Sequence, residues 1–267
     1  MNRVTGGSAQ GVSPLAPQAG GFPDPVLVRN ASGKGRFVLV CEHASNALPE
    51  RFGGLGLSAS DLSAHIAWDI GAAALTGRLS ALLDAPAVLA GYSRLLCDVN
   101  RPPGAADSIC AVSDGRAVPG NAALDETARR RRADGLYHPF HDALERILAR
   151  KEGAALVSIH SFTPVFGGRA RAMHAGVLFE GDNPFARSLA RALAREEGLD
   201  CRINEPYGPD DGVLHTLRRH GAGRDTAMIE VRNDLIGDKA GQERWARLLA
   251  DKLKEAERDG GQDEKRR

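Results

Sequence analysis

Short apolar runs alternate with longer amphipathic stretches along most of the chain. Five runs have the length and the nearly uninterrupted apolar character of strands buried on both faces: 37–41, 86–90, 155–159, 176–179 and 226–231. Four stretches repeat apolar residues at helical spacing: 69–83, 119–150, 183–197 and 242–254. Asn183 and Pro184 supply a capping residue and a first-turn proline for one of these helices. The alternation predicts an α/β fold with three layers, in which helices cover both faces of a mostly parallel central sheet.

The two ends of the sequence differ from the middle. Residues 1–22 are rich in Gly, Ser, Ala, Gln and Pro and contain little that could be buried, so we expect a flexible N-terminal tail. Residues 256–267 are nearly all charged or glycine, which predicts a charged C-terminal tail that frays from the last helix. No internal repeat or linker interrupts the middle, and the interpretation is therefore a single domain spanning residues 23–255.

Composition and charge exclude some classes of partner. The net charge of +1 gives no reason to expect binding to nucleic acid or to an anionic membrane. No segment approaches the roughly 18 consecutive apolar residues of a membrane-spanning helix, and the first residues lack the apolar block of a signal peptide. We therefore expect a cytoplasmic protein with a small-molecule partner, and homo-oligomer formation stays open.

Some residues of metal-binding type are better interpreted as structural. The cysteines are far apart and form no CxxC pair, which argues against a thiolate zinc site and against a disulfide scaffold: Cys41, Cys97, Cys110 and Cys201. His138 and His141 are one helical turn apart, a spacing that can bind a metal ion. They lie in a charged amphipathic helix, however, and a solvated or half-buried helix face is the favoured interpretation.

Three of the predicted strands lead directly into side chains that can bind a metal ion or transfer a proton. The first is followed by Glu42 and His43, another by His160, and the run at 226–231 contains Glu230 near its end. Ligands of open α/β sheets bind outside the carboxyl ends of the strands. A single histidine there is usually structural, but two histidines and a glutamate at equivalent positions favour a site. Such a set suits Zn²⁺, which leaves one coordination position for water and lowers the pKa of that water to about 7.

Arginines near the same strand ends suggest an anionic ligand. Arg94 and the pair Asn100-Arg101 bracket a short apolar segment, and Arg232 follows Glu230 by two residues. Guanidinium groups pair bidentately with carboxylates, so a cleft that contains several of them is typical of a site for an acidic substrate. Surface ion pairing is the alternative for any one of these arginines. Their flanking proline and strand signals favour the functional interpretation for Arg94 and Arg101.

Five blocks of the sequence, in this order along the chain, resemble the N-formylglutamate amidohydrolase family. They are CEHASN at 41–46, HIAWDIG at 65–71, YSRLLCDVNRP at 92–102, SIHSFTP at 158–164 and IEVRND at 229–234. The resemblance covers residues 25–255. It implies an α/β fold similar to that of the zinc carboxypeptidases and the hydrolysis of an N-acyl amide.

Carried over position by position, the resemblance implies roles for individual residues. His43 and His160 resemble metal ligands, and the third ligand is Asp69 or Glu42, with Asp69 preferred. Glu230 resembles the general base. The remaining candidates are substrate contacts: Arg94, Asn100, Arg101, Arg232 and Ser161. Ser161 could instead orient the ligands or be only a turn residue.

The reaction that the resemblance implies is the hydrolysis of N-formyl-L-glutamate to formate and glutamate, a reaction of histidine catabolism. This chain has Glu42 and Asn46 where many members carry Pro and Gly, which leaves the acyl group and the amino-acid moiety open. One alternative is a hydrolase of another N-acyl amino acid or of a short peptide. A second is a carboxylate-binding protein without catalysis. The turn-rich segment 205–212 has a length that could cover a substrate, although a plain surface loop is an equal alternative.

Overall fold

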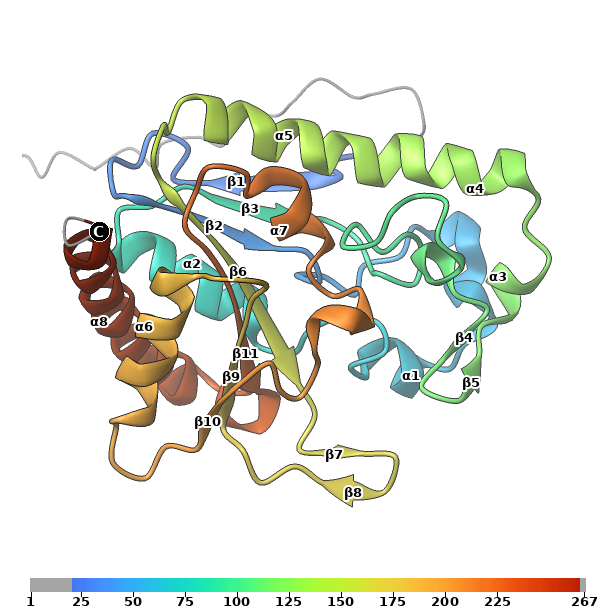
Figure 1. The fold of residues 1–267 in the computed structure, drawn as a ribbon. Helices are drawn as coiled ribbons and strands as arrows, with labels where there is room; N and C mark the ends of the chain where they lie inside the picture. The colour runs from blue at the N-terminus through green and yellow to red at the C-terminus, as the bar shows by residue number, and fades with distance from the viewer. Residues whose placement is uncertain (1–20, 265–267) are drawn as a thin grey trace, which may run out of the picture.

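A mixed sheet forms the middle layer of the computed structural model, which describes residues 21–264 (Figure 1). In spatial order its strands are β1 (Val26–Arg29), β3 (Ala87–Ala90), β2 (Phe37–Cys41), β6 (Ala155–Phe162), β11 (Thr226–Arg232), β9 (Ala175–Leu178) and β10 (Cys201–Ile203). Neighbours from β3 to β11 are parallel. β1 runs antiparallel to β3, β9 runs antiparallel to β11, and β10 is parallel to β9. The three-layer α/β architecture with a mostly parallel sheet is confirmed.

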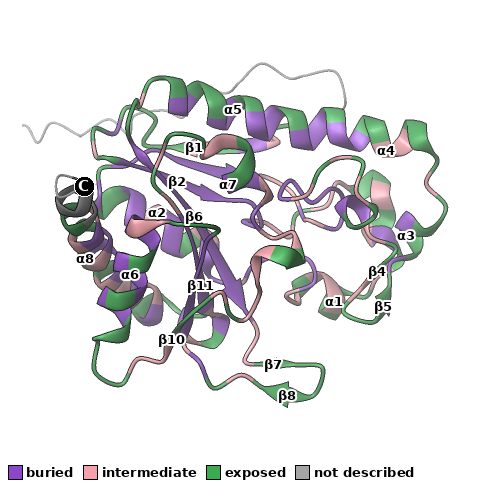
Figure 2. Cartoon of the chain, in the orientation of Figure 1, coloured by how far each residue is buried: buried purple, intermediate pink, exposed green. Residues whose placement is uncertain are grey.

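Helices cover both faces of this sheet. On one face lie α2 (Ala72–Leu82), α6 (Pro184–Ala194) and α8 (Lys239–Glu264). On the other face α5 (His138–Ala149) and the short α7 (His215–His220) pack through a second apolar cluster, and α4 (Glu126–Arg132) leads into α5 through the π-helical turn Ala133–Tyr137. The strands between the two edge strands of the sheet are almost wholly buried (Figure 2). The amide of Ala186 donates to the side chain of Asn183, which confirms Asn183 as the N-cap of α6.

Several smaller elements have no counterpart in the predicted set. Besides the edge strands β1 and β10, they include α1 (Ala59–Ser63) and 3-10 turns at Glu50–Gly56, Ala106–Ile109, Pro209–Asp211 and Asn233–Leu235. The short α3 (Pro119–Ala122), in contrast, falls within the helical stretch predicted at 119–150. Two hairpins also belong here, β4 (Val112–Ser113) with β5 (Arg116–Ala117) and β7 (Val165–Phe166) with β8 (Arg169–Ala170). The second hairpin directly follows β6 and so stands beyond the carboxyl end of that strand.

The described ends of the chain are more ordered than their composition predicts. Residues 1–20 and 265–267 lie outside the described residues, so most of the predicted N-terminal tail does as well. Phe22, at the end of that tail, is buried and stacks on Phe52 with ring centroids 5.6 Å apart. At the other end α8 continues to Glu264, and Ala256 is buried against the core, so the helix extends into the segment predicted as a tail. Ala256, Glu257 and Arg258 are good helix formers, and α8 needs only one apolar face to pack.

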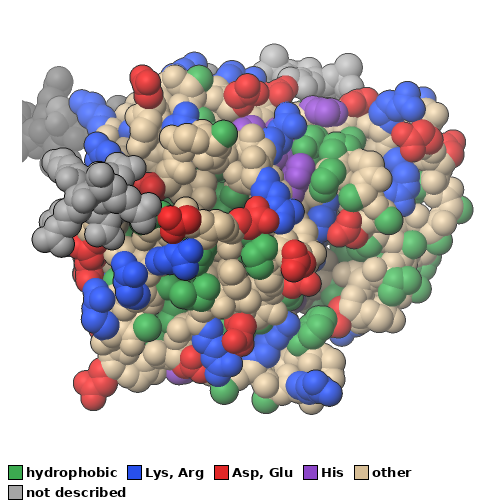
Figure 3. Space-filling view, in the orientation of Figure 1, with side chains coloured by type: hydrophobic (Ala, Val, Ile, Leu, Met, Phe, Trp, Pro, Cys, Tyr) green, Lys and Arg blue, Asp and Glu red, His purple; other side chains and the backbone are tan. Residues whose placement is uncertain are grey.

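The other sequence expectations concern the surface and the thiols. None of the four cysteines forms a disulfide. No helix in the described part of the chain is long and apolar enough to cross a membrane. Acidic and basic side chains are interspersed over the face drawn in Figure 3, with no large area of a single sign.

The buried His141 and the half-buried His220 form a pair that joins α5 to α7. The Nε2 atom of His141 lies 2.9 Å from the carbonyl oxygen of Val99 and therefore carries the proton. Its Nδ1 atom, 2.9 Å from Nε2 of His220, is then the acceptor of a hydrogen bond that His220 donates. His138, one turn earlier in α5, is exposed beside Asp134. The two α5 histidines therefore point to different environments and share no site.

This pair predicts a loss of stability in mild acid. Burial lowers the pKa of His141 to about 3 and that of His220 to about 4, whereas an unfolded histidine titrates near 6.5. The stabilisation is therefore complete above pH 6.5 and is lost as the pH falls below it towards the folded values. His141 alone should cost about 2 kcal/mol at pH 5, which corresponds to about 4–8 °C in Tm.

Thermal unfolding between pH 7.5 and pH 5 measures this effect. The variant His141→Gln should show a flatter dependence of Tm on pH, whereas His138→Gln should keep the wild-type slope. Equal slopes in all three proteins would contradict the assignment of acid sensitivity to the His141–His220 pair.

Candidate metal centre and active-site pocket

Three polar side chains from adjacent parallel strands face the same side of the sheet. Glu42 directly follows β2, His160 lies in β6 and Glu230 lies in β11, where it is the register partner of His160. Side chains alternate between the two faces of a strand. The apolar residues that share their parity pack in the core on the α5 side: Val40, Leu156 and Met228. Glu42, His160 and Glu230 therefore converge on that side, near the carboxyl ends of the strands.

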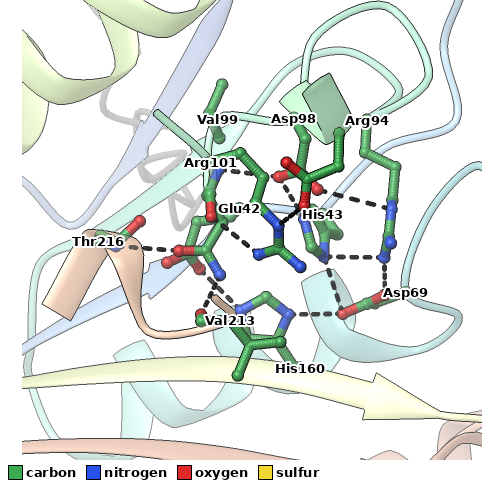
Figure 4. Close-up of polar contacts among 12 residues, drawn as sticks. Glu42, His43, Asp69, Arg94, Asp98, Val99, Arg101, His160, Val213 and Thr216 are labelled. Atoms are coloured by element: carbon green, nitrogen blue, oxygen red, sulfur yellow. Dashed lines mark hydrogen bonds and ion pairs between the residues drawn. The ribbon is translucent and has the colours of Figure 1, made fainter. Parts of the chain in front are cut away.

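His43 and Asp69 complete a compact cluster at this position. The loop before α2 is tied to the end of β2 by a bond of 2.9 Å from the Asp69 amide to the carbonyl of His43. The Oδ2 atom of Asp69 then lies 3.4 Å from Nδ1 of His43 and 2.7 Å from Nδ1 of His160. One ligand atom from each of His43, Asp69 and His160 lies within 4.8 Å of the others (Figure 4). The sequence prediction that these residues converge is therefore met by the geometry.

Each imidazole of the cluster is held between two carboxylates. On the side of His43 away from Asp69, the Nε2 atom of His43 lies 2.8 Å from Oδ1 of Asp98. The Nε2 atom of His160 lies 3.1 Å from Oε2 of Glu42. The Ser158 hydroxyl donates to the same Glu42 oxygen over 2.8 Å. Outer carboxylates of this kind orient metal-ligating histidines and raise their basicity. The geometry therefore places Glu42 behind His160, on the side away from Asp69.

The electrostatics of this cluster suit a divalent cation. Burial raises the pKa of Glu42, but the imidazole of His160 outweighs it and lowers that pKa to about 2. The pKa of Asp69 is likewise raised by burial, yet His43 and His160 bring it well below its usual value. The Oδ1 atom of Asp69 is buried without a hydrogen-bond partner among the described residues. The Nε2 atom of His160 has the ion-pair contact with Glu42, but the angles of that contact are not those of a hydrogen bond. In a tetrahedral zinc site, where nitrogen and oxygen ligands lie about 2.0–2.1 Å from the ion, two ligand atoms are about 3.3 Å from each other. The distance of 3.4 Å between Nδ1 of His43 and Oδ2 of Asp69 is similar.

Glu230 has the properties of a proton-transfer group. It is buried beside this cluster, and burial together with the Asp69 charge raises its pKa to about 7, although His160 and His43 oppose the rise. Its Oε2 atom has no hydrogen-bond partner among the described residues. A carboxyl group with a pKa close to the working pH can both accept and release a proton.

The predicted substrate-binding residues at 94–101 fall into two groups. Arg94 lies against the cluster, with one Nη atom 3.3 Å from Nδ1 of His43 and 3.7 Å from Oδ1 of Asp69. The side chain of Asn100 instead accepts from the Thr216 amide and donates to the Val213 carbonyl. Asn100 thus holds the start of α7, whereas Arg94 remains directed at the cluster.

Arg101 borders the pocket but is strongly engaged with protein atoms. Its Nε atom donates to Asp107 over 2.7 Å, and an Nη atom donates to the carbonyls of Asn100 and Gly212 over 3.0 Å. These bonds tie the 98–107 segment to the 205–212 loop.

Arg232 and Ser161, the other two predicted contacts, bind the protein itself. Arg232 pairs with Asp234 over 2.8 Å, and one of its Nη atoms donates to the carbonyls of residues 171, 172 and 173. The Ser161 hydroxyl donates to the carbonyl of Ile70 and its amide to Asp69. Ser161 thus orients a metal-cluster residue, and Arg232 fixes the segment around residue 171.

A pocket of about 740 Å³ opens from the cluster towards the surrounding loops. The 205–212 loop contributes Pro206, Tyr207 and Asp211 to its lining, so the segment borders the pocket. His65 also lines it, with Nδ1 3.4 Å from Oδ1 of Asp69. Sequence reasoning missed Asp98 and Arg171. Asp98 lies inside one of the five blocks, which was a usable signal, whereas Arg171 lies outside all of them.

The chain is similar to known proteins in both sequence and fold. The sequence model of the N-formylglutamate amidohydrolase family matches residues 35–237. The crystal structure of the gene product Atu2144 from Agrobacterium tumefaciens is 43% identical, with a TM-score of 0.84 over 87% of this chain and 94% of that one. N-formylglutamate amidohydrolase from Ralstonia eutropha JMP134 is 18% identical, with a TM-score of 0.59 over 88% and 98% of the two chains, which shows the fold alone. No curated protein matches the chain significantly.

Proposed function

Because the chain belongs to the N-formylglutamate amidohydrolase family, we propose that it is a metal-dependent enzyme that hydrolyses N-formyl-L-glutamate to formate and L-glutamate. The family supports amide hydrolysis as the reaction class. The observation that carries the proposal is the convergence of His43, Asp69 and His160 next to Glu230, a buried carboxyl group of raised pKa.

The proposed metal ion is Zn²⁺, held by His43, His160 and Asp69. Two imidazoles and one carboxylate are a common donor set for catalytic zinc, although other divalent ions accept the same donors. When bound, the ion would polarise the amide carbonyl and lower the pKa of a water molecule beside it. Asp98 and Glu42 would hold the two imidazoles in orientation through their Nε2 atoms, 2.8 Å and 3.1 Å away.

The chain's own residues account for the proton transfers. Glu230 would accept a proton from the attacking water as the new carbon–oxygen bond forms, and would give it to the amide nitrogen as the carbon–nitrogen bond breaks. Arg94, which lies within 4 Å of Asp69 and His43, would stabilise the negative charge that develops on the carbonyl oxygen. Water is consumed, and a carboxylic acid and an amine are released. In this proposal the reaction belongs to histidine catabolism in the cytoplasm.

A second hydrolase function is supported by the size of the pocket. Its volume of about 740 Å³ falls within the range of sites for drug-sized ligands and leaves room beyond a formyl amino acid. An N-acyl amino acid with a larger acyl group, or a short peptide, is therefore the second candidate.

Two measurements on the purified protein test the proposal. We expect about one equivalent of zinc per chain by elemental analysis, loss of activity on chelation and recovery when zinc is returned. On a panel of N-formyl-L-glutamate, N-acetyl-L-glutamate and dipeptides at one enzyme concentration, the formyl compound should give the highest kcat/KM. Hydrolysis of the dipeptides alone would favour the second candidate. Protein that binds glutamate but contains no metal and turns over none of these compounds would be a binding protein without catalysis.

A further inference from the structure

The arginines that line the pocket differ in the charge that surrounds them. Arg101 is paired with Asp107, Arg116 with Asp61, and Arg94 lies within 4 Å of both Asp69 and Asp98. Arg171 also lines the pocket. Among residues 21–259, whose side chains the structure describes, no carboxylate oxygen lies within 4 Å of a nitrogen of its guanidinium group. Arg171 therefore brings a positive charge to the pocket that the described chain does not neutralise by direct pairing.

Aromatic rings hold the guanidinium of Arg171 in place. Its Cζ atom lies 4.6 Å from the ring centroid of Phe166, 5.2 Å from that of Tyr207 and 5.7 Å from that of Phe162. One Nη atom lies 3.5 Å from the Tyr207 hydroxyl, a long contact. A guanidinium stacked on rings keeps the N–H groups along its edge free to donate to a planar anion. The surroundings thus order the side chain without using up its donors.

The backbone around Arg171 is fixed as well. Its amide donates to the carbonyl of Pro164 over 2.7 Å, which closes the base of the β7–β8 hairpin. Its own carbonyl accepts from Arg232, which is held in turn by Asp234. A residue that is constrained in this way loses little conformational entropy when it binds a ligand.

Tyr207 links Arg171 electrostatically to the reaction centre. Burial raises the pKa of the Tyr207 hydroxyl and the Glu230 carboxyl group raises it further, whereas Arg171 lowers it. Tyr207 is thus within electrostatic reach of both groups and stays protonated at neutral pH. Tyr207 and Arg171 lie side by side in the lining of the pocket that contains Glu230, so a substrate there meets a neutral hydrogen-bond donor and a cation.

We propose that Arg171 binds a carboxylate of the substrate and so determines the preference for an acidic amino-acid moiety. The inference rests on the proposed function and refines it, because the carboxylate contact moves to a residue that sequence reasoning did not select. The side-chain donors of Asn100 and Arg232 bind protein atoms, as do Nε and one Nη of Arg101. Arg94 keeps its place at the reacting carbonyl.

Kinetics of Arg171→Met test the inference on three substrates: N-formyl-L-glutamate, its side-chain amide N-formyl-L-glutamine, and its α-amide. For N-formyl-L-glutamate, kcat/KM should fall by about 10–100-fold, the size expected for a lost charge-assisted hydrogen-bonded pair. On the amide that lacks the carboxylate bound by Arg171, the fall should be less than about 3-fold, because no pair remains to be lost. Arg171→Lys should lie in between, since a lysine retains the charge but not the planar fork.

The matched control is Arg169→Met, which removes the same charge from β8 of the same hairpin, outside the pocket lining. It should leave kcat/KM within about 2-fold of wild type on all three substrates, as is usual for a surface substitution. An equal loss on all three substrates in Arg171→Met, or no loss at all, would overturn the inference.

Calorimetric titration with L-glutamate separates this inference from the proposed function. Wild-type protein that binds L-glutamate but hydrolyses none of the N-acyl compounds would contradict the proposed function. In that case a loss of L-glutamate affinity of about 10-fold or more in Arg171→Met would still support the inference. Normal turnover with unchanged glutamate affinity in Arg171→Met and Arg171→Lys would overturn the inference and leave the function standing. Wild-type protein that binds no L-glutamate would overturn it too.

Discussion

Glu230→Gln is expected to lower kcat on N-formyl-L-glutamate by about 10²–10⁴-fold, the contribution of a positioned general base. Glutamine has the shape of glutamate but cannot accept a proton at neutral pH. Because Glu230 is buried beside the His43–Asp69–His160 cluster and is not among its ligands, the metal content should remain near that of wild type. The pKa of Glu230, raised to about 7 by burial, is what suits it to proton transfer.

Two readouts separate this role from a structural one. Glu180→Gln makes the same substitution at an exposed glutamate that pairs with Arg218, and it should leave kcat unchanged. In the wild type, kcat/KM should decline as the pH falls through the pKa of Glu230, which a bound cation would move to lower pH. That acidic limb should be missing from the residual activity of Glu230→Gln. Near-wild-type kcat in Glu230→Gln would contradict the role of Glu230 as the general base.

The central layer of the fold could be predicted from the sequence because its strands are buried on both faces. β2, β3 and β9 carry apolar or small residues at nearly every position, and uninterrupted runs of this length are typical of strands covered by helices on both sides. The edge strands β1 and β10 were missed. They have only four and three residues with mixed or exposed positions, so their strand conformation depends on pairing with a neighbour rather than on local pattern.

The site was harder to locate because the apolar pattern stops before the strands do. β6 continues through His160 to Phe162 and β11 through Glu230 to Arg232. His160 and Glu230 are thus buried within their strands and do not mark the strand ends. Hydrophobicity alone cannot distinguish a buried polar residue inside a strand from a polar residue that follows it. Strand parity would have indicated that Glu42, His160 and Glu230 share a face. The partners of Arg171 lie in separate loops, at Phe166 and Tyr207, so only the folded chain reveals its isolation from carboxylates.

The third metal ligand was open between two carboxylates, and the structure predicts opposite behaviour for them. Asp69 lies between the Nδ1 atoms of both histidines, at 3.4 Å and 2.7 Å, whereas Glu42 lies behind His160 at its Nε2 atom. Asp69→Asn should therefore reduce zinc affinity by well over about 100-fold and abolish activity at equimolar zinc, because it replaces an anionic ligand with a neutral amide.

Glu42→Gln should reduce zinc affinity by only about 10–100-fold, the usual cost of losing an outer partner of a ligating histidine, and excess zinc should restore most of the activity. Titration with a competing chelator, followed by assay at increasing zinc, measures both effects, and Asp200→Asn at the surface is the control. The opposite ranking, with Glu42→Gln unable to hold zinc and Asp69→Asn binding one equivalent, would make Glu42 the ligand. In that case Nε2 of His160 would face the ion, and Asp69 would become the outer carboxylate that orients His160 through Nδ1.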